Sequence, residues 1–152
     1  MELVAIIKTI FAGILGTGGM SLAMWLITRS GVANADMIRA IGSIFTRSYE
    51  NSFGPGIIIH LIAGTVIAFI YILLINLLSP TSIAYFILTG AMIGLFHGVA
   101  FSFLLVVSVA EHHPLEQFRD AGSEVAIAHL VGHIIYGLII GAVVGILGIR
   151  FF

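Results

Sequence analysis

The chain has 152 residues, 60% of them hydrophobic, and a mean hydropathy of +1.20. Such values place it in the membrane class and, by length, predict a single domain spanning residues 1–152. The formal net charge is -1, which gives no indication of a nucleic-acid partner. Cysteine is absent, which excludes disulfides, thiolate metal ligands and iron–sulfur clusters.

Four apolar stretches are each long enough to cross a bilayer, which takes about 20 helical residues. They cover about residues 4–28, 56–78, 83–109 and 125–149. The short connections between them predict an all-α, four-helix transmembrane bundle of up-and-down topology. The N-terminal sequence MELVAIIK lacks the basic region and clear cleavage site of a signal peptide, so the first stretch is predicted to be a retained helix.

In such a bundle both termini lie on one side of the membrane, called side A here. The connections after the first and third helices lie on the opposite side, side B. Lys8 and Arg150 belong to side A, whereas four arginines belong to side B: Arg29, Arg39, Arg47 and Arg119. The positive-inside rule therefore predicts that side B faces the cytoplasm and that both termini lie outside.

A short amphipathic helix is predicted at about residues 35–47, between the first two spans. Its apolar face carries Met37, Ile38, Ile41, Ile44 and Phe45, and Arg39 falls on the other face. This pattern is typical of a helix lying in the membrane interface, with a loop packed on the bundle as the alternative. The sequence Gly54-Pro55-Gly56 predicts a break in the chain before the second span.

Two ridges of small residues recur at a spacing of four. Gly90, Gly94, Gly98 and Ser102 form one ridge in the third span, and Gly137, Gly141 and Gly145 form the other in the fourth. Small residues let helix backbones approach closely in lipid, where close packing replaces the hydrophobic effect. The ridges predict tight helix contacts, for which a four-helix chain offers internal partners.

Polar side chains are concentrated in the sequence EHHPLEQFRDAGSEVAIAHLVGH, residues 111–133. It contains four of the six histidines and four of the seven acids of a chain that is only 9% charged. Polar groups at this density in a membrane protein indicate a functional site. His129 and His133 are four residues apart, so they share one helix face and the spacing suits two imidazoles that bind one metal ion.

The second span brings His60 to the side B half of the membrane, and the third span brings His97 toward the level of His133 if it extends beyond the bilayer on side B. The metal site predicted from these positions consists of His60, His97, His129 and His133, between the second, third and fourth spans. Imidazole ligands suit zinc, copper or iron. Further ligands or entry groups are predicted at the mouth of the site: Glu111, His112, His113 and Glu124, with both histidines of this set solvated in a loop.

The sequence thus predicts an integral membrane metal-binding protein, alone, as a homo-oligomer, or as an accessory subunit of a larger membrane complex. One alternative is a transporter of protons or metal ions that uses the histidines as relay sites. Another is a b-type haem electron carrier, with His60 facing His129 or His97 facing His133 across the haem. No nucleophile or acid–base pair stands out, so the sequence leaves open whether the protein is an enzyme.

Several stretches carry a family resemblance, namely GILGTGGMSLAMWLI, DMIRAIGSIF, HLIAGTVIAFIY and EHHPLEQFRDAGSEVAIAHLVGHIIYG. In them the chain resembles a family of small four-helix prokaryotic membrane proteins of unknown function. The most specific parts are EHHP, residues 111–114, and GHxxYG, residues 132–137. The resemblance implies a four-span protein in a prokaryotic cell membrane, and it implies no activity and no site residues.

Overall fold

The computed structural model describes residues 2–152, apart from the side chains of residues 105–109. Within this part every regular element is helical, as the sequence predicts. The elements are α1 (Leu3–Arg29), α2 (Met37–Thr46), α3 (Phe53–Leu78), α4 (Ile83–Ala110), the 3₁₀ turn η1 (Glu116–Phe118) and α5 (Ser123–Leu147). Helices α1, α3, α4 and α5 are long and apolar enough to span a membrane, so the predicted four-span bundle is confirmed.

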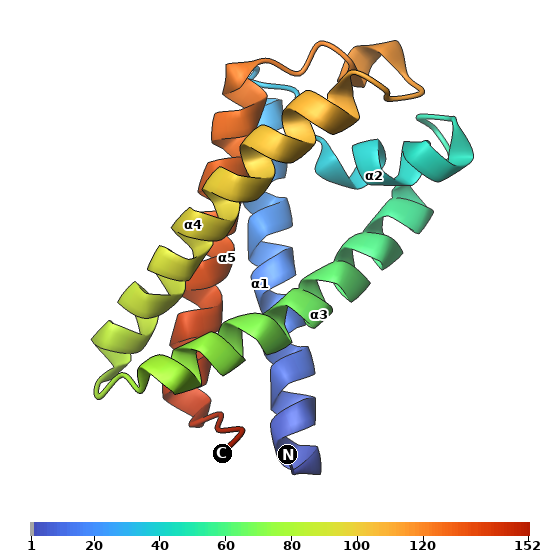
Figure 1. The fold of residues 1–152 in the computed structure, drawn as a ribbon. Coiled ribbons are helices and arrows are strands. Elements are labelled where there is room, and N and C mark those ends of the chain that lie inside the picture. Colours follow the sequence, from blue (N-terminus) through green and yellow to red (C-terminus); the bar gives the residue numbers. More distant parts are fainter. Residues whose placement is uncertain (1) are drawn as a thin grey trace.

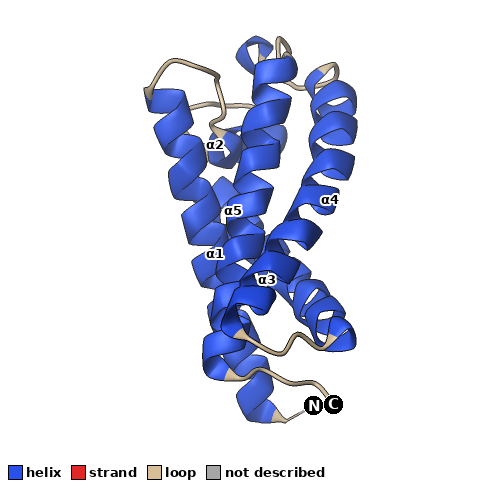
Figure 2. Ribbon diagram, turned by 90° about the vertical axis from the view of Figure 1, so that its left-hand side faces the viewer, coloured by secondary structure: helices blue, strands red, loops and turns tan. Residues whose placement is uncertain are grey.

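The helices are packed unevenly around the bundle. Helix α5 packs most extensively against α4 and also against α1, which in turn packs against α3. Figures 1 and 2 show both termini at one end of the bundle, with α2 and the connection between α4 and α5 at the other. Helices α3 and α4 meet at the turn 79–82 and diverge toward side B, with few contacts between them (Figure 1).

The glycine ridges of α4 and α5 make tight helix contacts, as predicted, and the structure shows that the two ridges face each other. A Cβ atom added at Gly94 would collide with the carbonyl oxygen of His133, and one at Gly141 would collide with the carbonyl oxygen of Phe86. Gly90 lies equally close to the backbone of Gly137. The two helices therefore touch through their backbones, and this contact is made within one chain.

The start of α3 differs from the predicted break at Gly54-Pro55-Gly56, because all three residues belong to the first turn of the helix. Proline is tolerated there since the N–H groups of a first helical turn have no intrahelical partner. Gly56 also has a packing role, because a Cβ atom at this position would collide with the carbonyl oxygen of Ile38 in α2. The glycine–proline sequence thus begins α3, and Gly56 allows α2 to pack closely against it.

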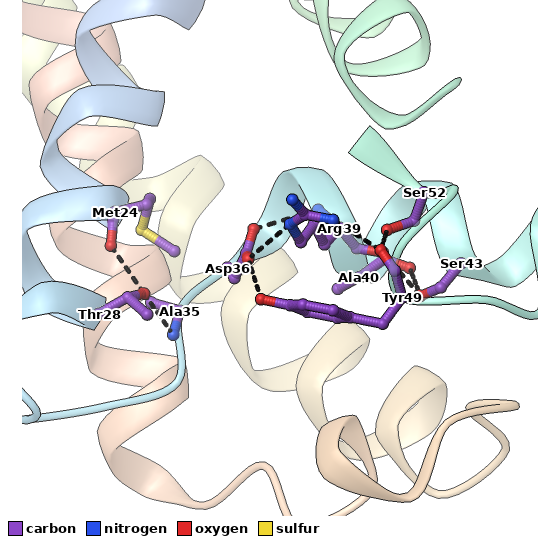
Figure 3. Close-up of polar contacts among 9 residues, drawn as sticks. All are labelled: Met24, Thr28, Ala35, Asp36, Arg39, Ala40, Ser43, Tyr49 and Ser52. Carbon is purple, nitrogen blue, oxygen red and sulfur yellow. Dashed lines mark hydrogen bonds and ion pairs between the residues drawn. The ribbon is translucent and has the colours of Figure 1, made fainter. Parts of the chain in front are cut away.

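Helix α2 confirms the predicted short helix and is held by a polar network at side B (Figure 3). The Asp36 carboxylate accepts hydrogen bonds from the Arg39 backbone N–H and from the Tyr49 hydroxyl, both at 3.2 Å. The Arg39 guanidinium donates to the Tyr49 carbonyl oxygen at 2.6 Å. Burial and the Asp36 carboxylate both raise the pKa of Tyr49, so its hydroxyl keeps the proton that it donates. The network joins the start of α2 to the connection that leads from α2 into α3.

The orientation of this bundle is testable with reporters fused to the C-terminus. We expect a C-terminal green fluorescent protein to remain dark and a C-terminal alkaline phosphatase to be active, because the arginines of side B favour the cytoplasm. A fluorescent fusion that lacks phosphatase activity would place the termini in the cytoplasm and reverse the predicted orientation.

Candidate functional site

A cavity of about 440 Å³ lies between the diverging halves of α3 and α4 on side B. Helices α1 and α5 complete its walls, and α2 with the connection 111–122 covers its side B end. The lining is mostly apolar, and it includes all four histidines of the predicted site: His60, His97, His129 and His133. A largely apolar cavity of this size with a few convergent polar groups is typical of a ligand or cofactor site.

The two histidines of α5 are held in one tautomer by the backbone of their own helix. The His129 Nδ1–H donates to the Val125 carbonyl oxygen at 2.8 Å, and the His133 Nδ1–H donates to the His129 carbonyl oxygen at 2.7 Å. Because a carbonyl oxygen only accepts, both Nδ1 atoms carry a proton, and each neutral ring keeps a lone pair on Nε2. Metal-ligating histidines commonly have this arrangement, in which a bond at one ring nitrogen orients the other.

His97 on α4 lies directly beside His133. The two ring centroids are 4.5 Å apart in an edge-to-face arrangement, and the Phe101 ring lies equally close to His97. The His97 Nδ1 also shares a hydrogen bond of 2.9 Å with the Tyr71 hydroxyl on α3. This spacing leaves no room for a macrocycle between His97 and His133, so the predicted haem pair formed by these two histidines does not fit the arrangement.

His60 on α3 is the most deeply buried of the four histidines and is only 7% exposed. It lies within electrostatic range of His129 and His133. Its Nε2 atom is buried and has no hydrogen-bond partner among the described residues. Leaving a buried polar group unpaired costs about 1–3 kcal/mol, so the atom indicates a partner that the chain itself does not supply.

Two tyrosines form the inner end of the site, and the sequence analysis did not identify them. The Tyr136 hydroxyl donates to the Gly64 carbonyl oxygen at 2.6 Å, which ties α5 to α3 below the histidines. The Tyr71 and Tyr136 rings pack edge to face with centroids 5.1 Å apart. Tyr136 follows His133 by three residues, so the helical period places it on the same face. Nothing in the apolar sequence around Tyr71 distinguishes it.

The mouth of the site differs from the prediction. His113 is 3% exposed rather than solvated, and it lines the cavity. Its Nδ1 accepts from the Leu115 N–H at 3.1 Å and its Nε2–H donates to the Ala40 carbonyl oxygen of α2 at 3.0 Å. This ring is buried because it joins the connection 111–122 to α2.

The other three predicted mouth residues lie on the surface, outside the cavity lining: Glu111, His112 and Glu124. Glu124 is in the first turn of α5, where a carboxylate is favoured by the N-terminal end of the helix dipole. Within the described part of the chain, no three histidine or acidic side chains converge closely enough to hold an ion in their present rotamers. A metal site here therefore requires side-chain rotation.

The contact between His113 and α2 can be tested by replacing His113 with alanine. We expect faster hydrogen exchange of the α2 backbone amides and a loss of about 0.5–1.5 kcal/mol, because the hydrogen bond from the His113 ring to the Ala40 carbonyl oxygen is lost. The matched control is His112→Ala, which changes the exposed neighbouring histidine. Equal exchange rates in α2 for His113→Ala and the parent would show that the hydrogen bond from His113 does not stabilise this helix.

The fold and the cavity define a class of protein, namely a four-span helical membrane protein with a histidine-lined site on one side of the membrane. The chain belongs to DUF6789, a family of unknown function, which matches residues 3–150. No curated protein and no solved structure matches the chain.

Proposed function

We propose that this protein binds a transition metal ion in the histidine-lined cavity. The tautomers of His129 and His133 carry the proposal, because both Nδ1 protons are committed to backbone carbonyls at 2.8 and 2.7 Å. Two Nε2 lone pairs on one helix face are thereby available to an electron-pair acceptor. Zinc, copper and iron all accept imidazole nitrogen.

His97 and His60 complete the proposed ligand set. The His97 ring already touches His133, and the buried Nε2 of His60 lacks a partner among the described residues. Rotation of these two side chains toward the α5 pair would give three or four nitrogen ligands from three helices. The exposed Glu124 and Glu111 are not needed in this set, which revises their predicted place as ligands.

The haem and transport alternatives remain predictions. For haem, His60 opposite His129 is the remaining axial pair, since the His97 and His133 rings are too close together. A proton or metal-ion path would need relay groups in both halves of the membrane. The histidines lie in the side B half, apart from His97 near the middle of α4. A metal ion is the occupant that uses the orientation of His129 and His133, whose Nδ1–H groups are bonded to backbone carbonyls, and it requires rotation of His60 and His97.

Elemental analysis of the purified protein tests the proposal. The protein is prepared from metal-replete cells without chelator, and a second sample is reconstituted with zinc, copper or iron. We expect about one metal ion per chain at neutral pH and release of the ion in acid, because imidazole ligands must be deprotonated to bind. Absence of stoichiometric metal in both samples would overturn the proposal. A Soret band in the visible spectrum would show that the bound group is haem and not a simple metal ion.

A further inference from the structure

The cavity is much larger than a metal ion requires. A buried water occupies about 30 Å³ of liquid volume, whereas the cavity measures about 440 Å³ and lies within the range of sites for small organic molecules. An ion with its ligands would fill only the end formed by His129 and His133. The remaining volume is lined largely by apolar side chains of α2, α3 and α4, which include Ile41, Ile67 and Phe101.

The cavity also has exposed lining residues at the depth of the hydrocarbon core. Ala63 on α3 and Phe101 on α4 both line the cavity and are both exposed. Ala63 lies about 15 Å of helix rise from the side B end of α3 at Phe53, and Phe101 lies about 14 Å from the end of α4 at Ala110. Since the hydrocarbon core is about 30 Å thick, the space between these residues faces lipid rather than water.

The polar groups inside the cavity define the chemistry of its occupant. The Nε2 atoms of His129 and His133 can only accept a hydrogen bond, because their protons are on Nδ1. The buried Nε2 of His60 has no partner among the described residues. A hydroxyl group can pair with any one of these atoms, since it donates to an Nε2 lone pair or accepts from an Nε2–H.

We propose that the cavity binds a lipid-soluble quinol that enters from the bilayer between α3 and α4. One ring hydroxyl pairs with the His60 Nε2 on the α3 wall, and the opposite hydroxyl donates to an Nε2 of the α5 pair. The flat ring packs against the Phe101 side chain, and the isoprenoid tail leaves between Ala63 and Phe101 into lipid. This inference goes beyond the proposed metal site and does not depend on it. Because both occupants use the same Nε2 atoms, the quinol binds to the metal-free protein.

Binding of the short-tailed quinol ubiquinol-1 tests the inference, measured anaerobically on detergent-purified, chelator-treated protein. Metal is absent from this assay, so failure of the metal proposal leaves its outcome unchanged. We expect saturable binding of ubiquinol-1 and weaker binding of ubiquinone-1, which has no hydroxyl to donate. His60→Leu should weaken quinol binding by about 5- to 150-fold, the loss expected for a buried hydrogen bond.

A second pair of variants tests the route of entry without altering a histidine. Ala63→Phe fills the opening between α3 and α4, whereas Ile62→Phe adds the same ring on the adjacent exposed position, which does not line the cavity. We expect Ala63→Phe to slow or abolish binding and Ile62→Phe to match the parent, with equal thermal stability of all three proteins. Absence of saturable quinol binding, equal binding by both phenylalanine variants, or a resident haem would each overturn the inference.

Discussion

Replacing His129 or His133 with alanine should weaken metal binding by at least about 100-fold. Loss of a group that merely orients a ligand typically costs 10- to 100-fold in metal affinity, and removal of a ligand costs more. The double variant should bind no metal at micromolar concentrations, because it removes both of the imidazoles whose Nδ1 protons are fixed by backbone carbonyls. Competition titration with a chromophoric chelator measures these affinities directly.

The control for these variants is His112→Ala, since His112 is exposed and lies outside the cavity lining. It removes one imidazole from the chain without altering the proposed ligand set, so its affinity should equal that of the parent. If both α5 variants retained stoichiometric metal at parental affinity, the ion would be bound elsewhere and the site would be wrong.

Replacing Gly94 with leucine should have the largest effect on the fold. Any side chain at this position collides with the His133 carbonyl oxygen, so α4 and α5 must separate along their whole contact. Overpacking a core usually costs about 1–3 kcal/mol, and a collision with backbone should exceed that range. We expect a lower thermal unfolding midpoint and loss of the monodisperse peak in size-exclusion chromatography.

The matched control is Gly18→Leu, which places the same side chain on an exposed glycine of α1 with no atom within 4 Å of the added Cβ. It should leave the unfolding midpoint unchanged, which separates the effect of the contact from the effect of losing a glycine. A Gly94→Leu protein as stable as the control would mean that α4 and α5 do not pack through their glycines.

The fold was largely predictable because a membrane-spanning helix requires a long apolar segment, which is easily recognised in the sequence. Length and hydropathy identify the four spans, and small residues at a spacing of four indicate tight helix contacts. That Gly94 meets the backbone of His133 is known only from the structure. The start of α3 was not predictable in this way. Gly54-Pro55-Gly56 has the composition of a break, but a first helical turn tolerates proline, and the close approach of α2 explains the glycine at position 56.

The candidate site was predictable in its membrane residues and not at its mouth. Buried histidines in spanning helices must face inward, and this reasoning brought together His60, His97, His129 and His133. His113 lies in a polar connection whose composition suggests exposure. Its burial depends on the Ala40 carbonyl, 73 residues earlier in the chain, and a long-range contact of this kind leaves no local signal.

The most direct test of imidazole-bound metal is X-ray absorption spectroscopy of the zinc-loaded protein. We predict nitrogen ligands at about 2.0–2.1 Å, with the outer-shell scattering of at least two imidazole rings. The same spectrum recorded for His133→Ala should show one imidazole fewer or no bound zinc. A shell of oxygen ligands without imidazole scattering in the parent protein would contradict the proposed site.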